Sequence, residues 1–146
     1  VHRGSDNKIY WATLEANGEF GHSKQADGVE TVDAPELNAV GDMFYLAYRT
    51  AKGAIGLKIR ARGASRWGKT TQHGGYETQP PMLVSDGKSA FLMTHLAGAE
   101  KPTVVVNRIL PDGEEANYQT KSFAIPPLMC ISAIGFVEHW FFCMLY

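Results

Sequence analysis

The sequence has little that could support chemistry through sulfur or a bound metal. Its 146 residues include two cysteines, Cys130 and Cys143, whereas a disulfide framework or a structural zinc site needs several closely spaced ligands. The five histidines are dispersed and show no metal-ligand spacing. We therefore expect no metal and no cofactor.

An excess of charge is also missing. Fourteen basic and fifteen acidic residues give a formal net charge of -1, without a block of like charges. Nucleic-acid binding depends on many cations that neutralise phosphates, and attraction to acidic lipids depends on polybasic segments. The sequence therefore predicts no nucleic-acid partner and no polybasic membrane contact.

No long apolar run is free of charge, and no targeting segment can be recognised. The most apolar stretch, 128–146, is interrupted by Glu138 and His139, so we expect a buried hairpin there instead of a membrane span. The chain starts at Val1 without the basic and apolar regions of a signal peptide. The compartment is left open, with a secreted or extracellular setting preferred.

The predicted C-terminal hairpin would bring the two cysteines together. With its turn between Phe136 and Val137, Cys130 lies directly opposite Cys143. A disulfide requires a non-hydrogen-bonded pair at that place, and the alternative is two buried free thiols. We favour the free thiols, because unpaired cysteine behaves as a small buried apolar residue.

Helix signals are absent, whereas a repeat of about 46 residues is clear. Pro35, Pro81 and Pro127 are spaced by 46 residues, and an apolar run and a turn follow each. The same spacing relates further glycine and apolar positions of the first two copies: Gly28 to Gly74, Gly41 to Gly87, Tyr45 to Phe91 and Leu46 to Leu92. Phe20-Gly21 and Trp67-Gly68 match with a spacing of 47.

Each repeat reads as four short strands. In the central copy we place them at 34–40, 43–49, 55–61 and 66–71, because aromatic and alternating stretches are separated by turn residues. Such units are typical of β-propeller blades, whose sheets are apolar on both faces and stack on one another. The sequence therefore predicts an all-β propeller with three blades per chain.

The blade boundaries place the termini inside one blade. We expect repeats at about 34–79 and 80–125, and a third made of 126–146 completed by 1–33. Propellers close with about four to eight blades, so three blades would leave apolar faces open. Either the chain forms a homo-oligomer, for example a dimer with six blades, or it is part of a longer propeller, and we favour the oligomer.

The repeat resembles sialidase-like propellers and the propeller lectins of fungi and bacteria. The resemblance rests on 33–37, 43–49 and 55–67, and it implies sugar binding in clefts between adjacent blades. There an aromatic ring would stack on the sugar while charged side chains bond its hydroxyls. The matching positions are the ends of the second strands, with nearby rings as platforms: Arg3, Tyr10, Trp11, Tyr48, Arg49, Trp67 and His95.

Three functions are compatible with this pattern. A multivalent lectin that binds glycans or glycoproteins is preferred, because repeated clefts raise avidity. A protein-interaction or structural propeller is the first alternative, in which Tyr48, Trp11 and Trp67 pack between blades and Arg49 is a solvated strand end. A glycosidase is the second. The carboxylates Asp33, Glu36 and Glu77 are candidates for it, but the Ser-x-Asp-x-Gly-x-x-Trp motif of sialidase blades is absent, so enzyme activity is not favoured.

Overall fold

The protein is built from β-strands. The computed structural model describes residues 1–74, 79–96, 103–111, 121–124, 130–137 and 139–145. These residues form thirteen strands and no helix, which confirms the all-β prediction. In this part of the chain, no helix is long and apolar enough to cross a membrane.

Within each sheet, strands that are consecutive in sequence pair with one another, and the described strands form four antiparallel sheets. The first sheet contains β1 (His2–Arg3), β2 (Lys8–Trp11) and β3 (Lys24–Glu30). The second contains β4 (Glu36–Val40), β5 (Met43–Arg49), β6 (Ile55–Ala61) and β7 (Thr71–His73). The third contains β8 (Met82–Ser85), β9 (Ala90–Leu96), β10 (Thr103–Ile109) and β11 (Lys121–Ala124). The C-terminal hairpin contains β12 (Cys130–Val137) and β13 (His139–Leu145).

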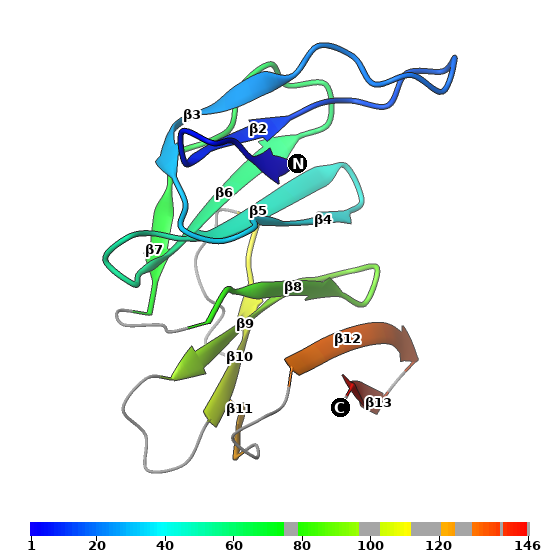
Figure 1. Cartoon of the computed structure of the whole chain (residues 1–146). Helices are drawn as coiled ribbons and strands as arrows, with labels where there is room; N and C mark the ends of the chain where they lie inside the picture. The colour runs from blue at the N-terminus through cyan, green and yellow to red at the C-terminus, as the bar shows by residue number, and fades with distance from the viewer. Residues whose placement is uncertain (75–78, 97–102, 112–120, 125–129, 138, 146) are drawn as a thin grey trace.

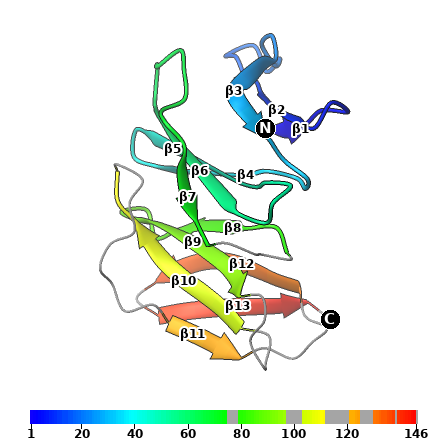
Figure 2. The same cartoon turned by 90° about the vertical axis from the view of Figure 1, so that its left-hand side faces the viewer.

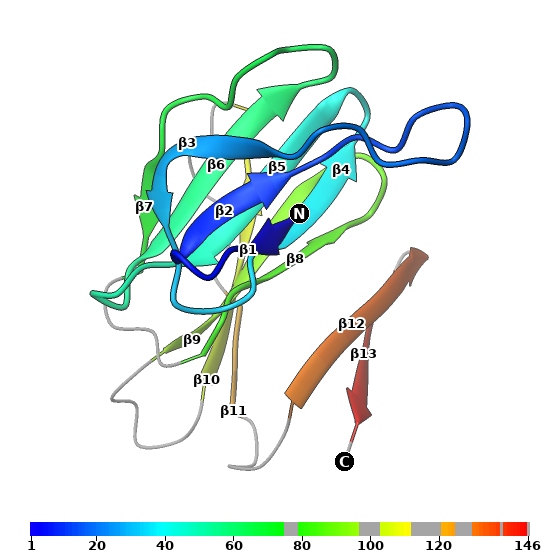
Figure 3. The same ribbon diagram turned by 45° about the horizontal axis from the view of Figure 1, so that its top comes forward.

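The sheets follow one another in space as they do in sequence. The first sheet lies at one end of the molecule and the C-terminal hairpin at the other, with the second and third sheets between them (Figures 1 and 2). Seen from above, the first sheet lies across β4, β5 and β6 (Figure 3). The described residues thus form an open stack, and they close no barrel or ring.

Strand β5 shows why the sheets stack. Four successive residues, Tyr45 to Tyr48, are buried, although alternate side chains of a strand point to opposite faces. A run that is apolar on both faces is stable in water only if both faces are covered. The sequence of β5 therefore requires a neighbour on each side of the second sheet.

Apolar clusters lie between the first and second sheets, between the second and third sheets, and on the far face of the third sheet. Between the first and second sheets are Ile9, Trp11, Ala26, Val29, Leu46 and Tyr48, with Trp67 packed against them. Between the second and third sheets are Tyr45, Ala47, Ile55, Leu57, Leu83, Ala90, Leu92 and Ile109. On the far face of the third sheet are Val84, Phe91, Met93, Val104 and Val106. Each fully buried aliphatic side chain contributes about 1.5–3 kcal/mol, so these clusters hold the stack together.

The spacing of 46 residues seen in the sequence recurs in the strand pairing. In the first sheet His2 pairs with Tyr10 and Arg3 with Ile9. In the second sheet, 46 residues later at every position, Tyr48 pairs with Gly56 and Arg49 with Ile55. The pair Leu37 and Leu46 recurs in the same way as Leu83 and Leu92. Strands β1, β2 and β3 therefore correspond to the end of β5, to β6 and to β7.

The turn between the paired strands repeats as well. The amide of Gly4 donates to Lys8 O at 2.8 Å, and the amide of Thr50 donates to Ala54 O at 2.9 Å, 46 residues later. Each turn has one residue with left-handed backbone, Asn7 with φ 63° and Gly53 with φ 82°. Asparagine tolerates this region better than most side chains, which explains how one turn accommodates a residue other than glycine.

Two predicted strands of the central repeat, 43–49 and 55–61, are observed with the predicted bounds. The strand predicted at 34–40 begins two residues later, at Glu36. The fourth was wrongly placed at 66–71, because β7 covers Thr71–His73. Side chains of β6 hold the intervening segment: Arg60 donates to Ala64 O at 2.9 Å and Lys58 to Gly68 O at 3.1 Å. The amide of Gly68 also donates to Ile59 O of β6 at 2.8 Å, but the regular ladder with β6 begins only at Thr71.

The hairpin predicted at the C-terminus is present, but its register differs from the prediction. Cys130 pairs with Leu145, and Cys143 pairs with Ser132. Val137 pairs with His139 and Phe136 with Trp140, which displaces the partners by three residues from the predicted register, and the shift between Ala133 and Phe136 returns only one of them. The expectation that Cys130 lies opposite Cys143 is therefore wrong, chiefly because the two strands pair about a later point in the sequence than predicted.

Gly56 allows Tyr48 to pack across the second sheet, and we predict that Gly56→Ala destabilises the fold by about 1–3 kcal/mol. A Cβ at position 56 would lie 2.7 Å from Tyr48 Cε2 and would overlap the rest of the phenol ring. Tyr48 is buried between two sheets and has little room to move. Urea unfolding measures the loss. In a Tyr48→Leu background the same change should cost much less, and an equal cost in both backgrounds would contradict the explanation.

Candidate functional site

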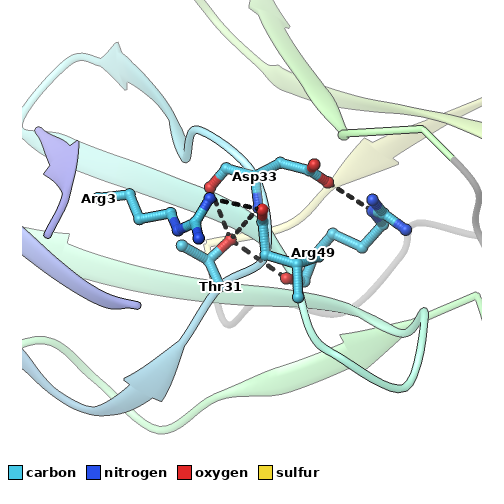
Figure 4. Close-up of polar contacts among 5 residues, drawn as sticks. Arg3, Thr31, Asp33 and Arg49 are labelled. Atoms are coloured by element: carbon cyan, nitrogen blue, oxygen red, sulfur yellow. Dashed lines mark hydrogen bonds and ion pairs between the residues drawn. The ribbon is translucent and has the colours of Figure 1, made fainter. Parts of the chain in front are cut away.

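The connection from the first to the second sheet passes the ends of β1 and β5 and is held there by a dense set of hydrogen bonds (Figure 4). The amide of Val32 donates to Arg49 O at 3.0 Å. The hydroxyl of Thr31, which is buried, lies 3.1 Å from Arg49 O and 3.0 Å from Asp33 O. The last residue of β5 is therefore tied to the connection through its backbone.

Arg49 also binds the connection through its side chain. Its Nε donates to Asp33 Oδ2 at 2.5 Å, and both side chains are mostly shielded, with 21% and 25% of their surfaces exposed. The hydrogen bond to Asp33 raises the pKa of Arg49, against the opposite effect of burial. A charge-assisted bond of this kind fixes the direction of the guanidinium.

Arg3 reaches the same connection from the first sheet. Its NH1 donates to Val32 O at 2.8 Å, and its Nε donates to Asn7 Oδ1 at 3.1 Å. The NH2 group also donates to Asn7 Oδ1, at 2.5 Å. A guanidinium has five N–H donors, so these bonds orient Arg3 and leave donors for a ligand. Arg3 is exposed to solvent.

Arg3, Arg49 and His95 occupy corresponding positions in three successive sheets. Each follows the previous one by 46 residues and lies at or next to the end of the second strand of its repeat. His95 pairs in register with Val104 of β10. It is partly buried, and burial lowers its pKa. The stack thus presents a basic or imidazole side chain at each corresponding strand end.

An aromatic pair lies on the opposite face of β1 and β2 from Arg3. The rings of His2 and Tyr10 are stacked, with centroids 5.7 Å apart and planes inclined by 19°. Tyr10 donates its hydroxyl proton to Asp6 Oδ2 at 2.9 Å, and this bond raises the pKa of Tyr10. The pair lies on the face of the first sheet away from Trp11, because alternate residues of β2 face opposite ways.

A second cluster of aromatic and charged side chains lies at the opposite end of the second sheet. Trp11 and Trp67 meet edge to face with centroids 6.4 Å apart. The guanidinium of Arg60 lies 3.9 Å from the Trp11 ring centroid, 5.4 Å from that of Trp67 and 5.0 Å from that of Phe44. Burial lowers the pKa of Arg60. Trp11 is only 6% exposed, so its ring packs between sheets.

These two clusters cannot serve one small ligand. Arg60 pairs with Phe44 near one end of the β5–β6 ladder, and Arg49 pairs with Ile55 at the other. Five residues of extended strand separate Phe44 from Arg49, which corresponds to about 16 Å. The structure therefore separates Arg49 from Trp67, which the sequence had suggested as parts of one kind of sugar cleft.

Tyr48, another predicted site residue, is part of the packing between sheets. Tyr48 is buried and its hydroxyl lies 3.3 Å from Thr70 Oγ1, so its ring faces the intersheet core. The roles of Thr31, Asp33 and Arg60 were not foreseen. Arg60 had been read as one of the polar residues alternating along β6. In a sheet that is covered on both faces, the polar side chains that alternate along β6 must also contact a neighbouring sheet. This reasoning could have predicted an intersheet contact for Arg60.

The described residues contain no group of three or more His, Cys, Asp or Glu side chains placed to hold a metal ion. Glu77, one of the candidate carboxylates, lies outside them. Comparison with known proteins finds no matching family model, no matching curated protein and no matching solved structure. The interpretation of the site therefore depends on its own geometry.

We predict that Asp33→Asn destabilises the protein by about 1 kcal/mol, because it removes the charged acceptor of a largely shielded Arg49. The matched control is Asp42→Asn. Asp42 pairs with Arg62, but their side chains are 85% and 66% exposed, so little change is expected. Chemical denaturation of both variants makes the comparison, and equal effects would show that the Asp33 pair is no more than a surface contact.

His95 makes the stability dependent on pH. Since burial lowers its pKa in the folded protein, the unfolded chain takes up the proton first as the pH falls through about 6.5. Stability is therefore lost on acidification, and His95→Gln should make the pH profile flatter. Urea unfolding measured from roughly pH 8 to pH 5, a range that spans the ordinary pKa of histidine, tests this prediction. His22→Gln, at an exposed histidine, controls for loss of an imidazole, and an unchanged slope in His95→Gln would refute the assignment.

Proposed function

We propose that this protein is a carbohydrate-binding, lectin-type β-propeller in which each four-stranded sheet is a blade. The observation that carries the proposal is the recurrence of Arg3, Arg49 and His95 at corresponding strand ends of stacked sheets. Repeated polar sites on one scaffold suit multivalent binding, whereas catalysis needs one differentiated site. Glycans or glycoproteins are the proposed partners.

The chemistry of the strand ends suits a neutral, hydroxyl-rich ligand. Arg3 and Arg49 are held in direction by Asn7 and Asp33, so less conformational entropy is lost when they bind. The stacked rings of His2 and Tyr10 lie on the opposite face of the first sheet and are not part of this set of donors. The hydroxyls of a pyranose can accept hydrogen bonds from N–H donors of this kind.

Within this proposal, the site residues are Arg3, Arg49 and His95, whereas Tyr10, predicted as a platform, lies on the opposite face of the first sheet from Arg3. Trp11 and Tyr48 are assigned to packing between the first two sheets, because both are buried there. Trp67 joins them, since its ring contacts Trp11 and the guanidinium of Arg60. The preferred assembly is a homo-oligomer that closes the ring of blades and multiplies the strand-end sites.

A glycosidase is less well supported. Such an enzyme requires two carboxyl groups that flank the scissile bond. Asp33 is engaged by Arg49. Burial raises the pKa of Glu36, but this residue lies on β4 and pairs in register with Ala47.

The proposal is tested by glycan-array screening of the full chain, followed by titration of any sugar found with single variants. Arg3→Ala and Arg49→Ala should each weaken binding by about tenfold or more, because each removes charge-assisted donors. Arg62→Ala is the matched control, since Arg62 is exposed and distant from these strand ends. Trp67→Ala should lower stability without a selective loss of affinity.

Several results would contradict the proposal. Binding that survives both Arg3→Ala and Arg49→Ala, or falls equally in Arg62→Ala, would separate sugar recognition from the strand ends. An array without any bound glycan would favour a protein-interaction module. Hydrolysis of chromogenic glycosides would favour the enzyme.

A further inference from the structure

The first sheet has an outer face, turned away from the second sheet, that carries unusual apolar exposure. Leu14 and Phe20 are 59% and 75% exposed, and a β-bridge joins them within the connection between β2 and β3. That connection projects from the stack beyond the end of β2 (Figures 1 and 3). We define the outer face by His2, Tyr10, Leu14 and Phe20.

The second sheet shows what these positions do when a neighbour is present. Leu14 corresponds to Arg60, 46 residues later, and Phe20 corresponds to Trp67, 47 residues later. The backbone supports the match: Gly21 donates to Thr13 O at 2.8 Å, and Gly68 donates to Ile59 O at 2.8 Å. Both Arg60 and Trp67 pack on Trp11 of the preceding sheet. Leu14 and Phe20 are thus at intersheet contact positions, and none of the described sheets lies in front of them.

The two ends of the chain are complementary in strand content. The first sheet corresponds to the end of a second strand, a third strand and a fourth strand, as its register with β5, β6 and β7 shows. The C-terminal hairpin provides two antiparallel strands that pair with no others in the described part of the chain. Together they supply the strands of one repeat. In one molecule they lie at opposite ends of the stack (Figure 2), so they cannot meet within it.

We propose that the outer face of the first sheet binds a second copy of this chain, at the end of the stack that carries the C-terminal hairpin. Leu14 and Phe20 are the apolar anchors of the contact. In the assembly, β1 is the strand of the first sheet that lies nearest to the C-terminal hairpin of the second copy. The contact is head to tail, so it yields a closed ring if the rotation per chain divides a full turn and a filament otherwise. This inference deepens the oligomer of the proposed function, and it rests on the repeating sheets rather than on sugar binding.

The test is the mass of the full chain in solution, measured by light scattering over a range of concentrations. The parent chain should form a discrete oligomer, and Leu14→Glu with Phe20→Glu should weaken association by about 100-fold or more, since two apolar anchors are lost. Both residues are exposed in the single chain, so circular dichroism should show the double variant as fully folded as the parent, while its unfolding midpoint loses the contribution of association.

Leu37→Glu is the matched control. Leu37 is 40% exposed but belongs to β4 of the second sheet, so the oligomer should persist. A parent chain that is monomeric at all concentrations would overturn the proposal, as would a double variant that keeps the parental mass. Because mass and glycan binding are measured separately, a failed array leaves this result intact, and a monomer that binds sugar refutes only the interface.

Discussion

The second sheet depends on a neighbour on each side, because its strand β5 is apolar on both faces. Strand β5 makes the constraint explicit: Leu46 and Tyr48 face the first sheet, while Tyr45 and Ala47 face the third. No single sheet of this composition could remain in water alone. The order of the stack, the position of the connections and the exposure at its first face all follow from this requirement.

The junction between the first two sheets is secured at both ends by different chemistry. At the strand ends, hydrogen bonds from Arg3, Thr31 and Arg49 converge on the short connection between the sheets. At the other end, Arg60 lies among aromatic rings of both sheets. Polar bonds specify direction, whereas packing of this kind needs close fit over an area. The first end can therefore offer oriented donors to a ligand, and the second holds the layers together.

Much of this architecture could be predicted from the sequence. The repeat of 46 residues located the strands of the central unit, since the period appears in spaced prolines, glycines and paired leucines. It also related the N-terminal residues to the end of β5, which the register of His2 with Tyr10 bears out. The register of the C-terminal hairpin was predicted wrongly, because an apolar run gives no distinct signal either for the point about which its strands pair or for a bulge. The start of β7 was missed because the segment before it meets β6 only through isolated contacts, such as those of Lys58 and Arg60 with its carbonyls.

The candidate site was less accessible to sequence reasoning. The repeat singled out Arg3, Arg49 and His95 as corresponding positions, but it could not show that Asp33 and Asn7 orient the two arginines. It also placed Trp11 and Tyr48 among the sugar platforms, although both rings are buried. Burial of an aromatic residue depends on which face its neighbour covers, and periodicity alone does not reveal that.

The edge-to-face contact of Trp11 with Trp67 has a spectroscopic consequence. Two of the three tryptophans in the chain lie at one junction, close enough for their indole transitions to interact. Intrinsic fluorescence and near-ultraviolet dichroism will therefore be weighted towards the separation of the first sheet from the second, whereas far-ultraviolet dichroism reports the loss of all strands. If the layers come apart one after another, the two signals will follow different transitions, and the chain will not behave as a two-state folder.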